Sequence, residues 1–207
     1  MATIGFTRED FEVFDIPTFP ERMQGIKERV RPKLIALGED LQPALKKLAK
    51  SDVFPHVAKH ARRTVNPPPE TWVAFGPSAR GYKQYGYFGI VVSRGGLHTR
   101  VVVKDEAPDR PQMAKVLMDR ADALAKVFAK QTVARYDRWD YAGIPEFTKP
   151  TADFWQKVAE VLAKKTGGLD VGVGWPAERA VKLTGKQVLG AFAALLPLHA
   201  TPSVTTG

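Results

Sequence analysis

The chain has 207 residues, no cysteine, and 31 Lys or Arg against 22 Asp or Glu, which gives a net charge of +9 at pH 7. The lack of cysteine excludes a disulfide framework, a thiolate zinc site and a cysteine nucleophile, and is compatible with a reducing cytoplasm. No apolar stretch approaches the ~20 residues that cross a bilayer, and Glu9 interrupts the N-terminus before a signal peptide could form. We therefore expect a cytoplasmic protein without a membrane segment.

The surplus positive charge is concentrated in one part of the chain. Between Lys46 and Lys104 there are eleven Lys or Arg against Asp52 and Glu70, so this segment alone has a net charge of +9. In the rest of the chain basic and acidic residues cancel. A localised field of this kind predicts an anionic partner, although it identifies no reaction.

The N-terminal 50 residues have the features of several short helices. Thr7 with Asp10 and Thr18 with Glu21 are candidate capping boxes, and apolar residues then recur at helical spacing until Leu48. Pro32 and Pro43 predict breaks between the helices.

Residues 53–65 predict a further helix with one apolar and one cationic face. His56, Lys59, His60 and Arg63 follow one another at positions i, i+3, i+4 and i+7. The prolines 67–69 end this segment. The spacing of His56 and His60 also occurs in zinc proteases, but Val57 replaces the expected Glu and no third ligand is apparent, so we expect no metal.

From Thr71 the apolar period changes to two, which predicts strands at 71–75, 86–93 and 98–106, the last two joined by a turn at Gly95-Gly96. Pairing 90 with 101 gives a core face of alternating apolar residues. The opposite face would present Tyr87, Arg100 and Lys104 to solvent around Gly89.

The C-terminal half predicts helices and short strands in alternation. We expect a five-turn helix from Asp109 to Phe128 crossing the core face of the sheet, strands at 133–139 and 169–173, and helices at 151–165 and 188–196. Gly172-Val-Gly174 lacks the turn and the acidic residue of a dinucleotide site. The order indicates a single α+β domain over residues 1–200, with a mainly antiparallel sheet, helices packed on one face, an N-terminal helical segment and a frayed tail at 201–207.

The block from Phe54 to Pro68, with Thr71-Trp-Val-Ala-Phe-Gly-Pro77 and Arg80-Gly-Tyr-Lys83, resembles the YktB-like family of uncharacterised bacterial proteins. The segment Gly5 to Phe14 and Arg31-Pro-Lys-Leu34 are similar to the same family. The resemblance implies a cytosolic, single-domain α+β protein. It implies no reaction, and no catalytic residue is transferred from it.

The strongest functional candidate is a set of basic and aromatic residues within 46–104. Positive side chains neutralise phosphates, and flat rings on an open strand face stack on bases, so this combination suits RNA or single-stranded DNA. The candidate ligand-binding residues are His56, Lys59, His60, Arg62, Arg63, Trp72, Arg80, Tyr82, Lys83, Tyr87, Arg100 and Lys104.

Two alternatives stay open. The protein could be an enzyme or sensor for a small anionic metabolite, with a pocket roofed by the predicted helix of His56 and His60 and by the loop Arg80 to Tyr85. The outer face of the hairpin could instead be covered by another subunit. We expect no cofactor, and the sequence leaves the oligomeric state open.

Overall fold

The computed structural model describes residues 3–141 and 143–199 and confirms an α+β fold with a six-stranded sheet in the order β1-β2-β3-β4-β6-β5. All the pairings are antiparallel. The predicted tail at 201–207 lies outside the described residues. The strands are β1 (Phe54–Val57), β2 (Glu70–Gly76), β3 (Gly86–Ser93), β4 (Gly96–Val103), β5 (Ala134–Arg135) and β6 (Leu169–Pro176).

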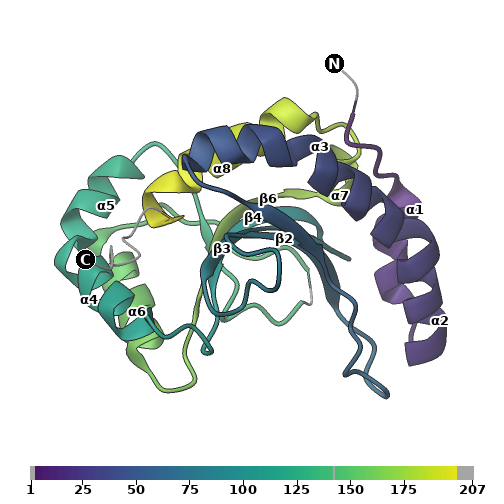
Figure 1. Ribbon diagram of the computed structural model, residues 1–207, viewed down its shortest axis with the longest axis horizontal. Helices are drawn as coiled ribbons and strands as arrows, with labels where there is room; N and C mark the ends of the chain where they lie inside the picture. The colour runs from purple at the N-terminus through teal and green to yellow at the C-terminus, as the bar shows by residue number, and fades with distance from the viewer. Residues whose placement is uncertain (1–2, 142, 200–207) are drawn as a thin grey trace.

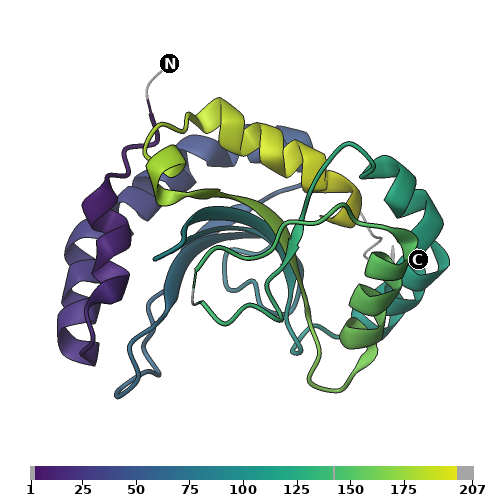
Figure 2. The ribbon, with the colours of Figure 1, turned by 180° about the vertical axis from the view of Figure 1, so that it is seen from behind.

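The helices surround the outer side of the curved sheet (Figures 1 and 2). α3 contacts β1 and β2, whereas α8 contacts β3 and β4. No helix among the described residues is long and apolar enough to span a membrane. The helical elements are α1 (Arg8–Glu12), η1 (Val13–Asp15), α2 (Phe19–Gly25), η2 (Ile26–Val30), α3 (Arg31–Ala49), α4 (Arg110–Asp119), α5 (Ala121–Val127), α6 (Ala152–Ala163), α7 (Ala177–Ala180) and α8 (Gly185–His199).

Both predicted N-terminal starts are confirmed, but the predicted breaks are wrong. The capping box of Thr7 and Asp10 precedes α1, and Thr18 donates a hydrogen bond to Glu21 at the start of α2. α2 continues through the π-helical turn η2 into α3, because the junction residues keep helical dihedrals. Pro32 lies in the first turn of α3, next to this π turn, and Pro43 lies inside α3. A π turn is a local irregularity that helices tolerate.

The predicted helix at 53–65 is wrong, because residues 54–57 form β1 and pair with Val73 to Gly76. In a segment this short, the apolar residues fit the spacing of a strand as well as that of a helix. The apolar pattern therefore could not distinguish the two structures. β1 is an edge strand, so its backbone N–H groups on one side have no neighbouring strand to pair with. Pro55, which has no N–H group, is therefore tolerated there. His56 and His60 therefore do not share a helical face.

The hairpin of β3 and β4 keeps the predicted faces at a different register. Ile90 pairs with Thr99 and not with Val101, because the turn is centred on Arg94-Gly95, one residue before the predicted centre. This moves every pair by two residues, which leaves each side chain on its predicted face. The six residues predicted for the core face are at most 1% exposed: Phe88, Ile90, Val92, Thr99, Val101 and Val103.

The predicted five-turn helix is two helices, α4 and α5, which meet at Arg120 and pack against α6. Most of its apolar stripe is buried there, as shown by Phe128, whose ring centroid lies 5.0 Å from that of Trp155, but Val127 is exposed. The helix that contacts β3 and β4 is α8, where Phe192 packs against Phe75 and Phe88. The predicted strand at 133–139 is limited to Ala134–Arg135.

Replacing Phe192 by Ala should lower the free energy of unfolding by about 3–5 kcal/mol, because the ring is fully buried between α8 and the sheet. Urea denaturation would measure the change. The matched control is Val127→Ala, at a side chain that is 52% exposed, which should alter stability by less than about 0.5 kcal/mol. Equal effects at the two sites would contradict this assignment of the core.

Candidate functional site

A pocket of about 650 Å³ lies where the loop between β2 and β3 meets the end of β1, and we call it the loop pocket. It is lined by residues 56–59, by Ser78 and by residues 80–85. The metabolite alternative placed a pocket at these two segments, but it expected a helix, whereas His56 lies in β1 and His60 does not line the pocket. The structure thus brings together five of the twelve candidate residues: His56, Lys59, Arg80, Tyr82 and Lys83.

Gly76 at the end of β2 allows the loop to approach the sheet closely. A Cβ at this position would lie 2.5 Å from the Cβ of Tyr82 and 3.1 Å from its Cα. Any larger residue would push Tyr82 away. A turn from Tyr82 to Tyr85 then returns the chain to β3, with the Tyr85 N–H donating to the Tyr82 carbonyl at 3.1 Å.

Hydrogen bonds fix the inner wall of the loop pocket. The His56 Nε2 lies 2.8 Å from the carbonyl oxygen of Ser78, which can only accept, so Nε2 carries a proton and donates it. The His56 and Tyr82 ring centroids lie 5.2 Å apart, and the indole N–H of Trp72 donates to the Tyr82 hydroxyl at 3.0 Å. Burial raises the pKa of Tyr82, although the Trp72 bond opposes the effect. The wall is therefore held in place before any ligand arrives.

The three candidate aromatic residues do not form an open stacking platform, so that expectation is wrong. Tyr87 is 3% exposed, and its ring packs edge-on against Tyr82 at 4.8 Å. Trp72 is half-buried and bonded to Tyr82. These rings pack on one another, and the most exposed aromatic residue in the lining of the loop pocket is the neighbouring Tyr85, at 43%.

The outer part of the loop pocket is cationic. Lys59, Arg80 and Lys83 are exposed. Lys83 lies 3.5 Å from Glu106, an exposed pair that contributes little energy. Within residues 3–141 and 143–199, the side chains of Lys59 and Arg80 have no ion-pair partner. An anion entering the pocket would thus meet positive groups that no protein carboxylate has neutralised.

His60, Arg62 and Arg63 follow β1 in a turn beside the loop pocket and do not line it. His60 has a positive φ of 54° and lies 3.0 Å from the Thr71 hydroxyl. Burial lowers the pKa of His60 to about 4, and Arg63 and Arg31 add to the shift. Arg62 and Arg63 are exposed, and an Arg63 N–H donates to the Asn66 carbonyl at 3.5 Å.

Arg100 lies in the interior, which corrects the expectation that it faces solvent. It is 1% exposed, its Nη2 lies 2.8 Å from Glu70, and its Nη1 lies 3.6 Å from Asp170. The segment after β5 covers it, with the Tyr136 ring centroid 3.7 Å from the guanidinium carbon. Burial opposes the charge, but Glu70 and Asp170 hold the pKa of Arg100 above its usual value. Lys104, half-buried at the end of the same strand face, lies near Asp170.

The polar network around Arg100 was missed by the sequence reasoning. His98 lies 3.0 Å from the Tyr136 hydroxyl and 3.2 Å from Ser93, and all three are buried. Burial lowers the pKa of His98 well below its usual value. The alternation of side chains along the strands could have indicated this network. Glu70 and Asp170 occupy strand positions on the same face of the sheet as Arg100. Which carboxylates reach the guanidinium depended on the strand order.

Several of the eleven cations between Lys46 and Lys104 are paired. Lys46 lies 2.5 Å from Asp52, Arg94 lies 2.8 Å from Asp15, and Arg100 is neutralised as described. Asp52 and Glu70 belong to the same segment, whereas Asp15 and Asp170 come from other parts of the chain, so the fold adds two carboxylates to this cationic segment. In the described part of the chain, no group of three His, Asp or Glu side chains could hold a metal ion.

Comparison with known proteins identifies the relatives of this chain. The domain of unknown function DUF1054 matches residues 6–199. The chain belongs to this family. It is 39% identical over 152 residues to a UPF0637 protein of Bacillus velezensis, covering 73% of this chain and 68% of the relative. It is also 33% identical over 207 residues to a UPF0637 protein of Lysinibacillus sphaericus, covering 96% of each.

This membership confirms the resemblance to the YktB-like proteins. A UPF0637 protein of Bacillus cereus is 34% identical over 201 residues, which cover 94% of this chain and 96% of the relative. The shared length includes both the loop pocket and the strands around Arg100. No activity is assigned to this family, so the geometry of the site is the basis for a functional proposal.

Asp170 should titrate in the folded protein with a pKa of about 6, because burial raises its pKa from 3.8 and outweighs the attraction of Arg100 and Lys104. The folded state then binds this proton more tightly than the unfolded chain. The contribution of Asp170 to the free energy of unfolding is therefore largest in acid and falls as the pH rises from about 4 to about 6. Carbon NMR of the carboxyl group would measure the pKa directly.

The matched control is Asp170→Asn. The stability of the wild type relative to this variant should fall through the same pH window and stay constant above it. A relative stability that is constant from pH ~4 to pH ~6 would contradict the assignment.

Proposed function

We propose that this protein binds a small phosphate-bearing or carboxylate-bearing molecule in the loop pocket. The observation that carries the proposal is the convergence of Lys59, Arg80 and Lys83 at a concave site whose inner wall is fixed by hydrogen bonds. A volume of about 650 Å³ falls within the usual range of small-molecule sites. We place this function in the cytoplasm, as the composition predicts.

The division of labour within the loop pocket follows from its chemistry. The guanidinium of Arg80 can bind two oxygens of one phosphate or carboxylate, whereas the ammonium groups of Lys59 and Lys83 act as point charges. With Nε2 committed to the Ser78 carbonyl, Nδ1 of His56 is the ring atom that can accept a hydrogen bond. A ligand with both an oxyanion and a hydroxyl or amide donor would satisfy all of these groups.

Single-stranded nucleic acid is the second candidate, favoured by the exposed ring of Tyr85 on the loop pocket and by the exposed Arg62 and Arg63 beside it. Stacking of several bases finds less support, because Trp72, Tyr82 and Tyr87 pack on one another. A pocket contact with one terminal phosphate is compatible with both candidates. Salt dependence and ligand length separate them.

Arg80→Gln and Lys59→Gln should each weaken the binding of a nucleoside monophosphate about threefold to tenfold, because each removes one charge-assisted contact. Isothermal titration calorimetry would measure the affinity. The matched control is Arg29→Gln, an exposed cation that does not line the loop pocket and should leave the affinity unchanged. The proposal fails if neither phosphate nor the nucleotide binds, or if all three variants behave alike.

A 20-residue single-stranded oligonucleotide serves as the second probe. A small ligand held by two or three contacts should lose affinity only slightly as salt increases, with a shallow slope of log affinity against log salt. If the oligonucleotide binds much more tightly than the nucleotide, with a steep slope, the nucleic-acid candidate replaces the metabolite. Equal affinities with shallow slopes support the pocket.

A further inference from the structure

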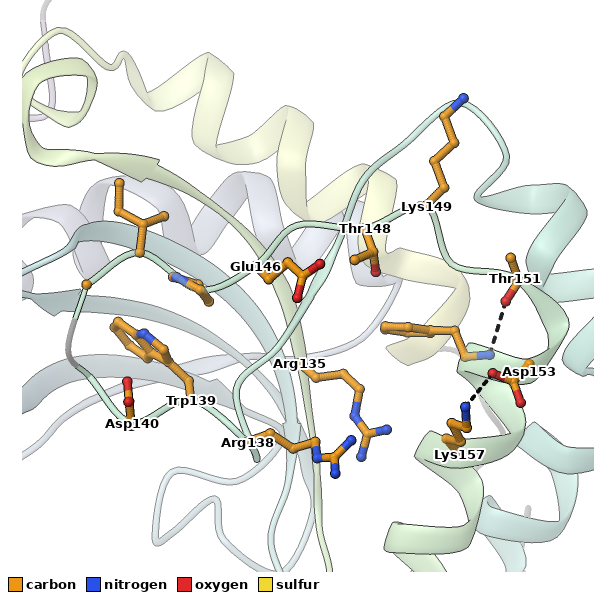
Figure 3. Close-up of a pocket in the computed structure, with 14 residues that line it drawn as sticks. Arg135, Arg138, Trp139, Asp140, Glu146, Thr148, Lys149, Thr151, Asp153 and Lys157 are labelled. Carbon is orange, nitrogen blue, oxygen red and sulfur yellow. Dashed lines mark hydrogen bonds and ion pairs between the residues drawn. The ribbon is translucent and has the colours of Figure 1, made fainter.

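A second cavity, of about 780 Å³, lies between the segment that follows β5 and the first turn of α6, and we call it the α6 cavity. It shares no lining residue with the loop pocket. Figure 3 shows Arg135 and Arg138 entering it from the end of β5, Glu146 from the returning segment, and Asp153 and Lys157 from α6.

The charges of the α6 cavity differ in kind from those of the loop pocket, because both signs are present. Arg135 is committed to Asp137 through two hydrogen bonds of 3.1 and 2.7 Å, and Lys157 is committed to Asp153 at 2.7 Å. Among the residues that the structure describes, Arg138 and Glu146 have no hydrogen-bond or ion-pair partner. Lys149 also lines the cavity and has no such partner within the described ranges, but in Figure 3 its ammonium group points away from these two side chains. One guanidinium and one carboxylate are therefore available to a ligand inside the cavity.

The two available charges face the same space. In Figure 3 the guanidinium groups of Arg135 and Arg138 lie close together in the lower part of the view, and the carboxylate of Glu146 lies above them. A ligand with only negative charge would gain from Arg138 but would be repelled by Glu146, and a purely cationic ligand would meet the opposite problem. The arrangement suits a molecule that has both an anionic and a cationic group.

Four apolar residues line the α6 cavity beside its polar groups, and one of them has an unsatisfied donor. Trp139, Ile144, Pro145 and Phe154 line the cavity. The indole N–H of Trp139 is shielded from solvent and has no acceptor within the described residues. A shielded donor without a partner is uncommon in native proteins and is satisfied by a bound carbonyl or water. Trp139 and Phe154 offer a ligand apolar surface.

We propose that the α6 cavity binds a zwitterionic small molecule of the amino-acid or dipeptide type with an apolar side chain. The ligand carboxylate would pair with Arg138 beside Arg135, its ammonium group with Glu146, and its side chain with Trp139 and Phe154. The cavity volume exceeds that of a single amino acid and admits a dipeptide. The site is independent of the loop pocket.

The test compares L-leucyl-L-phenylalanine with its N-acetyl form, its C-terminal amide and free L-phenylalanine, by calorimetry on the full chain. We expect the zwitterionic dipeptide to bind and each blocked form to bind about tenfold more weakly, since each loses one charge-assisted contact. Binding of L-phenylalanine as tightly as the dipeptide would assign the site to free amino acids. Tighter binding of the dipeptide would assign it to peptides.

Two variants connect the ligand groups to their residues. Arg138→Gln should weaken the binding of the zwitterionic dipeptide about tenfold but leave the affinity for the C-terminal amide unchanged. Glu146→Gln should weaken the binding of the zwitterionic dipeptide about tenfold but leave the affinity for the N-acetyl form unchanged. Both side chains are exposed, so the variants should keep the wild-type unfolding transition. Arg29→Gln, at an exposed cation that lines neither cavity, is the control and should leave the dipeptide affinity unchanged. The proposal is overturned if no zwitterion binds at millimolar concentration, or if the blocked forms bind as well as the free dipeptide.

Discussion

The antiparallel pairing of β3 with β4 is the constraint on which the rest of the structure depends. Because successive side chains in a strand point to opposite faces, this register places Phe88, Ile90 and Val101 against the helices and Tyr87 and Arg100 on the inner face. A shift by a single residue would bury Arg100 among the apolar residues of the core. The register thus determines both the core and the polar side of the sheet.

The inner face shows how the fold handles a buried charge. Leaving Arg100 unpaired in the interior would cost several kcal/mol. The sheet avoids this cost because Glu70 of β2 and Asp170 of β6 both form ion pairs with the guanidinium. Satisfying this cation removes it from the surface. The cations still available to an anion are those on loops, such as Lys59 and Arg80, whose segments end beyond the sheet. The candidate ligand site therefore lies at the end of β1 and not on the open strand face.

Sequence reasoning succeeded where a single element has a strong local signal and failed where two signals competed. The apolar alternation of residues 86–103 identified the correct faces even though the turn lay one residue earlier than predicted. Residues 54–57 have apolar positions compatible with a helix and a strand, and only pairing with β2 decided for the strand. The expectation that Trp72 and Tyr82 would stack on bases was wrong, because the two side chains are hydrogen-bonded to each other. They are ten residues apart in the chain.

The sequence by itself determined the α+β class, the starts of α1 and α2, the core face of the hairpin and the family resemblance, because these rest on local periodicity, capping and residue identity. The tertiary structure alone decided which cations stay available, where the loop between β2 and β3 meets β1, and which groups line the α6 cavity. These features arise from contacts between residues distant in the chain. Such contacts depend on strand order and loop paths, which no local pattern of residues specifies.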